Sequence, residues 1–296
     1  MVGFVHEALV HHGDEEFRAG AEAFLRAAVD AGESAIALVD SSRRHLLDGL
    51  AGTGVRLVDA ERLARNPARL IPVLRELVDS ADGPVRCLAD PMPTPRHADA
   101  AAELALHDAL LNLAFADTTG FALRCAVPAA GAAAAERTHP VLVSADEVRT
   151  SGAFSPGAAV DAFGATLTAP VEALAAVHFT LDDLPELRDL VTVRASAFGL
   201  PRERALDLTL ATNEIVTNSI VHGGDRGTLR LWQTETTFVC EVTDSGHIRN
   251  PLVGRVAPVP ATLGGRGVWL ANQLCDLVRI RSDASAGTCV QLQIDR

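Results

Sequence analysis

Residues 213–223 read NEIVTNSIVHG and place an acid, Glu214, four positions before an amide, Asn218. The apolar residues between them favour a helix, and residues four apart share one face of a helix. A carboxylate can accept a proton from a nucleophile, and an amide oxygen is a hard ligand that suits Mg²⁺. Such pairs also occur by chance on solvated helices, so this pair indicates a site only together with the segments that follow it.

The first of these segments is a predicted strand over residues 237–243, TFVCEVT, which runs into DSGHI. Asp244, an acid at the end of that strand, can accept a hydrogen bond from the exocyclic amine of an adenine. Gly246 lets the backbone come close to the ring because it has no side chain. Asp-Ser-Gly is also an ordinary turn, and the pattern therefore predicts an adenine site only together with its neighbours.

Two further segments complete the series. Residues 264–267 read GGRG and precede a predicted helix over 268–276. Glycines before a helix N-terminus leave backbone N–H groups for phosphate oxygens, and the helix dipole favours the anion. Residues 286–294, AGTCVQLQI, are a turn into a strand, where the Thr288 hydroxyl can close an adenine pocket. The ordered series indicates a nucleotide site, and neither a Walker P-loop nor a Gly-x-Gly-x-x-Gly run is present.

From about residue 178 to residue 296 the chain resembles the ATP-binding domain shared by histidine kinases, heat-shock chaperones and gyrase, which is the GHKL or Bergerat fold. Within that group it most resembles the anti-sigma factor serine kinases. The resemblance implies an α/β sandwich that binds ATP and Mg²⁺, with Glu214 as the general base, Asn218 as the Mg²⁺ ligand and Asp244 as the adenine-binding acid. The other nucleotide-binding residues that it implies are His222, Gly246, Ile248, Gly264, Gly265, Arg266, Gly267 and Thr288.

Two positions depart from the family pattern. Ile248 stands where many relatives have a second glycine after the adenine-binding acid, so the backbone there should be arranged differently. Leu263 stands where well-studied anti-sigma kinases carry a basic residue that faces the terminal phosphate, and Arg266 is the candidate substitute. ATP binding is therefore better supported than phosphoryl transfer.

The front half, residues 1–145, alternates predicted helices and short apolar strands. The helices are expected over 14–31, 43–50, 67–80 and 98–115, and the strands over 34–39, 55–58, 85–89 and 121–127. This rhythm predicts a mostly parallel sheet covered on both faces.

The front half resembles the MEDS domain, a sensory module of methanogens and methylotrophs that is related in fold to RecA-like α/β proteins. The matching features are His6 with Phe17, Gly32 with Glu33, Glu103 with Asn112, Cys125, and His139 with Pro140. His6, Glu103 and His139 are the candidate residues for a small-molecule signal, although such side chains are more often structural. No phosphate loop occurs here, so no second ATP site is expected.

Composition narrows the class of protein. The 296 residues are 48% hydrophobic and 22% charged, which suffices for two domains with cores of their own. A net charge of −12 argues against a direct nucleic-acid surface. No apolar run reaches the roughly 18 residues of a membrane span and no signal peptide is visible, so a cytoplasmic protein is expected. The five cysteines are scattered and predicted to be reduced and mostly packed, and no metal-ligand spacing stands out among the histidines.

The expected organisation is a sensory domain over 1–145, a linker over 146–177 and an ATPase domain over 178–296. The linker is rich in small and helix-breaking residues, and the ATPase domain begins with a strand at 178–180 and a helix at 185–198. By resemblance the chain is an anti-sigma regulatory factor and a protein serine/threonine kinase in transcription regulation. Its partners would be a sigma factor and a STAS-type antagonist that it phosphorylates on serine, and a homodimer is compatible with this reading.

Three alternatives remain open at this point. The first is a nucleotide-gated binding protein without chemistry, which Leu263 favours. The second is a sensor histidine kinase, which needs a phosphoacceptor histidine on a dimerisation helix, whereas the nearby candidate His178 lies in a strand-like context. The third is a chaperone- or topoisomerase-like clamp, which is disfavoured because those proteins append a transducer domain after the ATP site.

Overall fold

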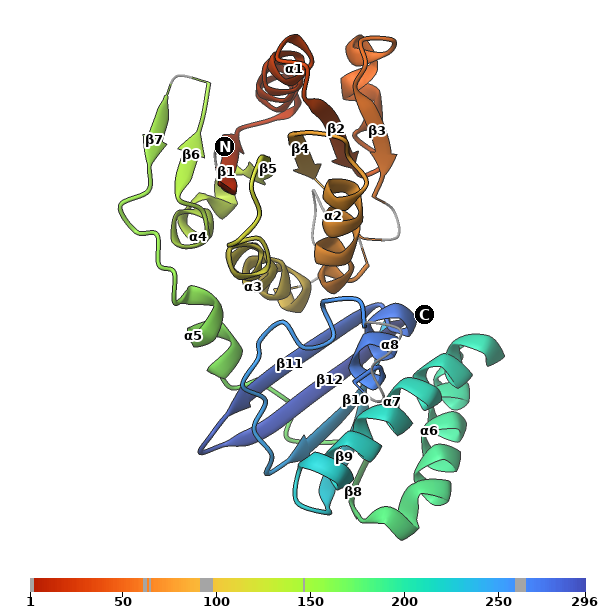
Figure 1. The fold of residues 1–296 in the computed structure, drawn as a ribbon. Coiled ribbons are helices and arrows are strands. Elements are labelled where there is room, and N and C mark those ends of the chain that lie inside the picture. The colour runs from red at the N-terminus through yellow and green to blue at the C-terminus, as the bar shows by residue number, and fades with distance from the viewer. Residues whose placement is uncertain (1–2, 61–62, 64, 91–97, 146, 259–264) are drawn as a thin grey trace. The chain divides into compact units, whose positions relative to one another are not determined.

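The computed structural model describes residues 3–60, 63, 65–90, 98–145, 147–258 and 265–296. The chain divides into two compact units, Met1–Ala159 and Val160–Arg296. The helix α5 (Ala158–Gly164) lies where one unit passes into the other (Figure 1). No helix among the described residues has both the length and the apolar character that a bilayer crossing requires.

The first unit contains a seven-stranded sheet in the order β3-β2-β4-β5-β1-β6-β7. All neighbouring strands are parallel except β7, which runs antiparallel to β6. The prediction of a mostly parallel α/β fold is therefore confirmed. The strands are β1 (Val5–His11), β2 (Ser34–Val39), β3 (Arg56–Asp59), β4 (Val85–Asp90), β5 (Phe121–Pro128), β6 (Val141–Val143) and β7 (Val148–Thr150).

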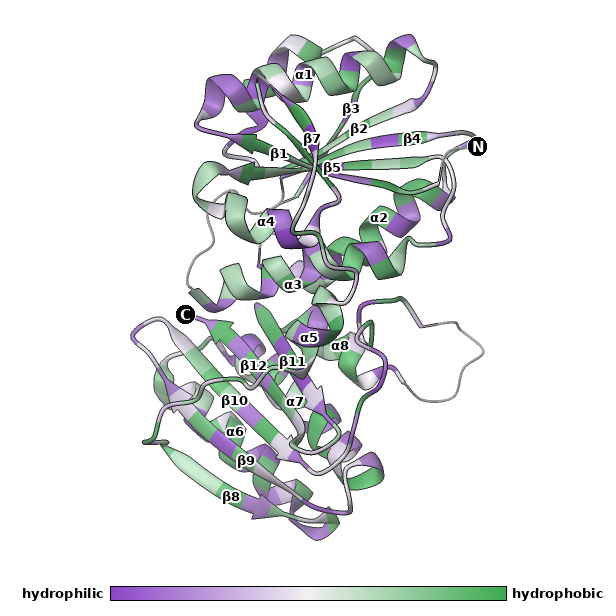
Figure 2. Cartoon of the chain, turned by 90° about the vertical axis from the view of Figure 1, so that its left-hand side faces the viewer, coloured by the Kyte–Doolittle hydropathy of each residue, from purple (hydrophilic) through white to green (hydrophobic). Residues whose placement is uncertain are grey.

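Helices cover both faces of this sheet, as Figures 1 and 2 show from two directions. On one face lie α1 (Asp14–Asp30) and the 3-10 helix η1 (Arg44–Leu50), and on the other lie α2 (Leu70–Asp79), α3 (Ala98–Ala114) and α4 (Ala132–Thr138). The short 3-10 helices η2 (Pro67–Arg69) and η3 (Ala129–Gly131) precede α2 and α4. Helix α1 buries one apolar stripe at helical spacing, which is Phe17, Ala21, Phe24, Leu25 and Ala28.

The predicted elements of this unit need two corrections. The segment expected as a helix over 43–50 is a 3-10 helix, and the one expected over 67–80 is divided, because Pro67 starts a 3-10 turn before α2. Strands β1, β6 and β7 were not among the predicted elements. Strand β1 nevertheless occupies a central position, between β5 and β6.

The second unit is a two-layer α/β sandwich. Its five-stranded sheet is antiparallel throughout, in the order β11-β12-β10-β9-β8. Helices α6 (Leu184–Phe198), α7 (Arg202–His222) and α8 (Gly267–Leu274) cover one face of it (Figure 1). The strands are β8 (Ala175–Phe179), β9 (Gly227–Gln233), β10 (Thr237–Asp244), β11 (Leu277–Asp283) and β12 (Gly287–Asp295). The predicted sandwich is confirmed.

Local signals in the sequence fix the position of α7, the helix that carries residues 213–222. A capping box between Thr180 and Asp183 opens the 3-10 helix η4 (Leu181–Asp183), which leads into α6. Gly199 ends α6 with a φ of 100°, a left-handed conformation that favours glycine. The chain then turns into α7, which buries Leu208, Ala211 and Ile215 in the core. Hydrophobic and hydrophilic residues are interleaved along β9 and β10 in Figure 2.

Candidate functional site

A cavity of about 390 Å³ lies in the second unit, where α7, the end of β10 and the start of α8 meet. It gathers segments that are far apart in the sequence. Its lining residues are Ile215, Asn218, Ser219, His222, Gly223, Asp244, Gly246, His247, Ile248, Val253, Gly265, Val268, Thr288 and Val290. The structure thus brings together residues from all four sequence segments that predict a nucleotide site.

The carboxylate of Asp244 is held in one orientation by two donors. The Ser219 hydroxyl donates to Oδ2 at 2.6 Å, and the Gly246 backbone N–H donates to Oδ1 at 2.7 Å. An ionised carboxylate has about four lone-pair sites, so both oxygens keep acceptor capacity for a further donor. Asp244 is half-buried and borders the cavity, so such a donor can come from a molecule inside it.

Glycines allow the backbone to close around Asp244. A Cβ atom on Gly223 would lie 2.4 Å from Asp244 Cγ, and one on Gly246 would lie 2.8 Å from the His222 carbonyl oxygen. Gly287 has a φ of 85°, and a Cβ there would lie 2.1 Å from the Asp244 carbonyl oxygen. All three approaches are too short for any side chain, so the shape of this end of the cavity depends on glycine.

We expect Gly223→Ala to destabilise the second unit by about 1–3 kcal/mol, because the new methyl group would displace the Asp244 carboxylate or the α7 C-terminus. Chemical denaturation of the purified chain measures the change. Gly164→Ala is the matched control, since a Cβ at Gly164 meets no atom within 4 Å. Equal stability of the two variants would contradict the close packing at Gly223.

A chain of hydroxyl groups joins the Asp244 segment to the last two strands. The Thr288 hydroxyl donates to the Gly246 carbonyl at 2.8 Å and lies 2.8 Å from the Ser282 hydroxyl. The Ser282 oxygen also accepts the Ile248 N–H at 2.8 Å. Ile248 occupies the place of the second glycine, and here its N–H is bound to β11 while the residue lines the cavity. The altered position therefore contributes an apolar wall.

The side chains of Glu214 and Asn218 both face the start of α8. A Cβ on Gly267 would lie 2.8 Å from Glu214 Oε2 and 3.2 Å from Asn218 Nδ2. Asn218 lines the cavity, and Glu214 lies one turn earlier on α7, half-buried. The first N–H groups of a helix lack partners within the helix, and the Arg266 side chain makes no capping hydrogen bond to α8. The acid, the amide and a helix N-terminus therefore converge at one end of the cavity.

The glycine-rich segment before α8 is described only in part. Gly265 has a φ of 75°, is exposed and lines the cavity. Arg266 is exposed and is the N-cap residue of α8, and Gly267 is the buried first residue of that helix. Gly264 and Leu263 lie outside the described residues. His222, the last residue of α7, is exposed and borders the cavity.

Sequence reasoning did not single out every residue of this site. Ser219 follows Asn218 directly and orients Asp244, although no role was assigned to it from the sequence. Gly223 closes the same end of the cavity. The apolar walls, Ile215, Val253, Val268 and Val290, carry no motif. The one indication of Ser219 in the sequence is its place directly after Asn218, the predicted metal ligand.

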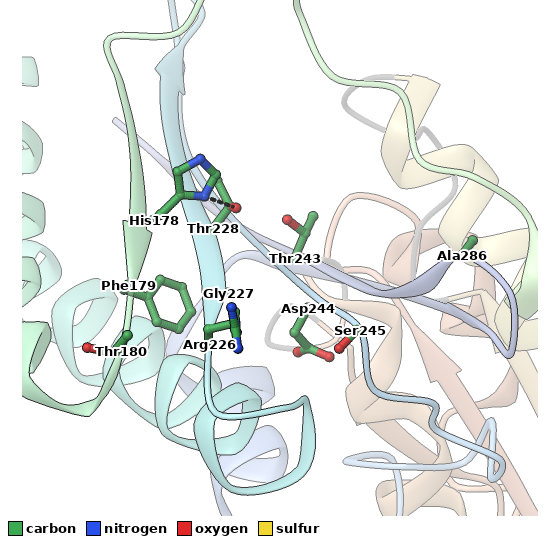
Figure 3. A pocket seen from close by; sticks show the side chains of 10 residues that line it. All are labelled: His178, Phe179, Thr180, Arg226, Gly227, Thr228, Thr243, Asp244, Ser245 and Ala286. Atoms are coloured by element: carbon green, nitrogen blue, oxygen red, sulfur yellow. Dashed lines mark hydrogen bonds between the residues drawn. The ribbon is translucent and has the colours of Figure 1, made fainter.

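Asp244 also borders a second hollow, of about 670 Å³, on the side of β8 and β9. Figure 3 shows its lining residues, among them Arg226 and a His178 ring that makes a 2.9 Å hydrogen bond with the Thr228 hydroxyl. Although this hollow is larger, neither Glu214, Asn218 nor the start of α8 lines it, so the smaller cavity is the candidate site. His178 lies on the edge strand β8 and not on a helix, which disfavours it as a phosphoacceptor.

In the first unit, His6 and His139 lie side by side, with ring centroids 4.1 Å apart. Glu103 is buried on α3, but the α3 residue that reaches His6 is Asn112, nine positions further along. A cavity of about 500 Å³ in this unit is bordered by other residues, among them Glu7 and Arg124. The structure therefore gathers two of the three candidate ligand residues and places them outside that cavity.

Comparison with known proteins assigns each unit to a family. Residues 177–294 match the family model described as a histidine kinase-like ATPase domain. Residues 5–140 match the model of the MEDS domain, the methanogen/methylotroph DcmR sensory domain. No curated protein sequence matches the chain.

Among solved structures, one match is the RsbU and RsbW domains of Rv1364c from Mycobacterium tuberculosis, at 19% sequence identity and a TM-score of 0.31. The match covers 41% of this chain and 33% of that one, so the two share only part of their length. The two family models carry the assignment: the chain joins an N-terminal MEDS sensory domain to a C-terminal histidine kinase-like ATPase domain.

Proposed function

We propose that the second unit binds Mg·ATP in the cavity bordered by Asp244 and that the chain acts as an anti-sigma regulatory kinase. The observation that carries the proposal is the fixed Asp244 carboxylate at one end of the cavity, with Asn218 and the start of α8 at the other. In this arrangement the Asp244 carboxylate accepts a hydrogen bond from the exocyclic amine of the adenine. Asn218 holds Mg²⁺, and the N–H groups at Gly265 and at the start of α8 hold phosphate oxygens.

The chemistry proposed for the site is in-line phosphoryl transfer to a serine of an antagonist protein. The serine oxygen attacks the γ-phosphorus, the bond from that phosphorus to the β,γ-bridging oxygen breaks, and ADP leaves. Glu214 receives the proton of the serine hydroxyl. When bound, Mg²⁺ neutralises charge on the phosphates, and the start of α8 offers its positive dipole end to the same groups.

The partners proposed are a sigma factor, which the ATPase domain sequesters, and a STAS-type antagonist, which it phosphorylates. The family assignment supports a regulatory ATPase, and the net charge of −12 suits basic protein surfaces better than nucleic acid. The MEDS domain would control this activity through a small-molecule signal, since its family is a sensory one.

A nucleotide-gated binding protein without kinase activity is the second candidate. Leu263 supports it, because a leucine cannot neutralise charge on the terminal phosphate. Incubation of the chain with radiolabelled ATP and the antagonist distinguishes the kinase from the binding protein. Phosphoserine on the antagonist supports the kinase, whereas intact ATP binding without phosphoserine supports the binding protein. Loss of ATP binding by the native chain would overturn both.

We expect Asn218→Ala to weaken Mg·ATP binding by on the order of tenfold or more, because it removes the oxygen ligand proposed for Mg²⁺. The fold should survive, since Asn218 faces the cavity and not the core. Isothermal titration with ATP, with and without Mg²⁺, measures the effect. Thr217→Ala is the matched control, because the Thr217 hydroxyl bonds the Asn213 carbonyl of its own helix. Unchanged Mg²⁺ dependence in Asn218→Ala would remove this residue from the site.

A further inference from the structure

Three side chains that bind soft and borderline metals meet in the interior of the MEDS domain. His6 lies on β1, Cys125 on the neighbouring strand β5, and His139 between α4 and β6. One ligand atom from each residue lies within 4.8 Å of the other two, and all three residues are buried. This is the one such group found among the described residues.

Hydrogen bonds behind the two imidazoles orient their rings. The Asn112 amide nitrogen donates to the Thr138 carbonyl at 2.8 Å, so its oxygen is the atom that faces His6 Nδ1, at 3.1 Å. His6 Nδ1 must therefore carry the hydrogen. His139 Nδ1 lies 3.2 Å from the Ala135 carbonyl, which can only accept, and 2.9 Å from the Thr138 hydroxyl, which can accept or donate. A hydrogen on Nδ1 satisfies both neighbours of His139, and this tautomer keeps the lone pair on Nε2. Both rings are then oriented through Nδ1, as metal-binding histidines in proteins are.

The cluster has too few hydrogen-bond donors for the lone pairs of its two imidazole Nε2 atoms. Cys125 Sγ lies 3.5 Å from His6 Nε2, so the thiol hydrogen can satisfy that nitrogen. His139 is fully buried, and its Nε2 has no hydrogen-bond partner among the described residues. A buried acceptor without a donor costs about 1–3 kcal/mol, and the part of the chain that the structure describes supplies no donor for this one.

We propose that His6 Nε2, His139 Nε2 and Cys125 Sγ form a binding site for a Zn²⁺-class cation in the sensory domain. The cation takes the lone pairs of all three atoms and displaces the thiol proton, which passes to solvent, so that Cys125 binds as a thiolate. Three protein ligands leave a fourth tetrahedral position for water or a small exogenous ligand.

One separation within the cluster matches the spacing expected of ligands around such an ion. Ligands at about 2.0–2.1 Å for nitrogen and 2.3 Å for sulfur, at tetrahedral angles, lie about 3.5 Å apart. The observed separation of His6 Nε2 and Cys125 Sγ is 3.5 Å. The ligand set of one thiolate and two imidazoles favours Zn²⁺ over Mg²⁺ or Ca²⁺, which prefer oxygen.

The test uses the 296-residue chain, stripped with a chelator and dialysed free of nucleotide and Mg²⁺. After the stripped chain is reloaded with Zn²⁺ and desalted, we expect one Zn²⁺ per chain by elemental analysis. Co²⁺ loaded in its place should give a thiolate-to-cobalt charge-transfer band with tetrahedral visible bands. Cys125→Ser should abolish that band and weaken Zn²⁺ binding by more than about 100-fold, since loss of a mere outer partner already costs 10–100-fold. Cys87→Ser is the control, because Cys87 is buried on the adjacent strand β4 and belongs to no such cluster.

His139→Gln serves as a second variant should Cys125→Ser fail to fold. It should keep the cobalt–thiolate band but bind Zn²⁺ at least tenfold more weakly than the native chain. The proposal is overturned by a native chain that binds no stoichiometric Zn²⁺, by a cobalt complex without the thiolate band, or by Zn²⁺ affinity that is equal in the native chain and in whichever of these variants folds. ATP titration of the same samples reports on the second unit, so failure of either site is seen separately.

Discussion

Glu214→Gln is expected to lower phosphoryl transfer to the antagonist serine by on the order of 10²–10⁴-fold, while ATP affinity changes by less than about threefold. Glutamine keeps the size of glutamate but cannot take the serine proton. The carboxylate lies against the start of α8, beside the cavity lined by Asn218, so it is placed for the phosphate end of a bound nucleotide. A fall in transfer without a fall in binding is what the loss of a base predicts.

Single-turnover transfer from radiolabelled ATP measures the first quantity, and titration with a non-hydrolysable ATP analogue measures the second. Glu203→Gln is the matched control, since Glu203 is exposed in the first turn of the same helix. A transfer rate unchanged by Glu214→Gln would remove Glu214 as the base. A parallel loss of ATP affinity would instead make Glu214 a residue that shapes the cavity.

The residues that line the cavity bordered by Asp244 could be named from the sequence because many of them lie in short motifs. The Asp244 turn and the Gly287–Thr288 turn are each recognisable in the sequence, and both occur where the structure has the end of β10 and the start of β12. Their meeting depends on strand register, since Asp244 pairs directly with Thr288. Register follows from the pairing of whole strands, so the sequence indicates the two turns but not the contact between them.

Other features escaped prediction for related reasons. In strands β1 and β9 polar residues such as His6, Glu7 and Arg230 are mixed with apolar ones. These strands therefore lack the apolar pattern by which a strand is predicted from sequence. The partner of Asp244 is Ser219, on another element, and only the packing of α7 against β10 reveals that hydrogen bond.

The histidine–cysteine cluster shows the limit of spacing rules most clearly. Familiar metal motifs place ligands a few residues apart, whereas His6, Cys125 and His139 come from both ends of the MEDS domain. The parallel pairing of β1 with β5 and β6 brings them to one place. No metal-ligand spacing stands out among the histidines in the sequence, and the fold supplies the proximity that spacing does not.

Asp244→Asn should weaken ATP binding by on the order of 10–100-fold. A hydrogen bond from a neutral donor to a charged acceptor contributes about 1.5–3 kcal/mol, and every 1.4 kcal/mol corresponds to a factor of ten. Asparagine can retain the structural contacts, because its oxygen can accept the Gly246 N–H and its amide nitrogen can donate to Ser219. What it loses is the negative charge and the second acceptor oxygen that the adenine amine would use.

Comparison of ATP with inosine triphosphate isolates this contact, because inosine lacks the exocyclic amine. The native chain should prefer ATP by a similar factor, and Asp244→Asn should lose most of that preference. Asp225→Asn is the control, since Asp225 is exposed and has a φ of 65°, a conformation that asparagine tolerates well. If the native chain binds both nucleotides equally, Asp244 does not recognise the base. The carboxylate would then serve to hold Ser219 and Gly246 in place, and the purine would have to be recognised elsewhere in the cavity.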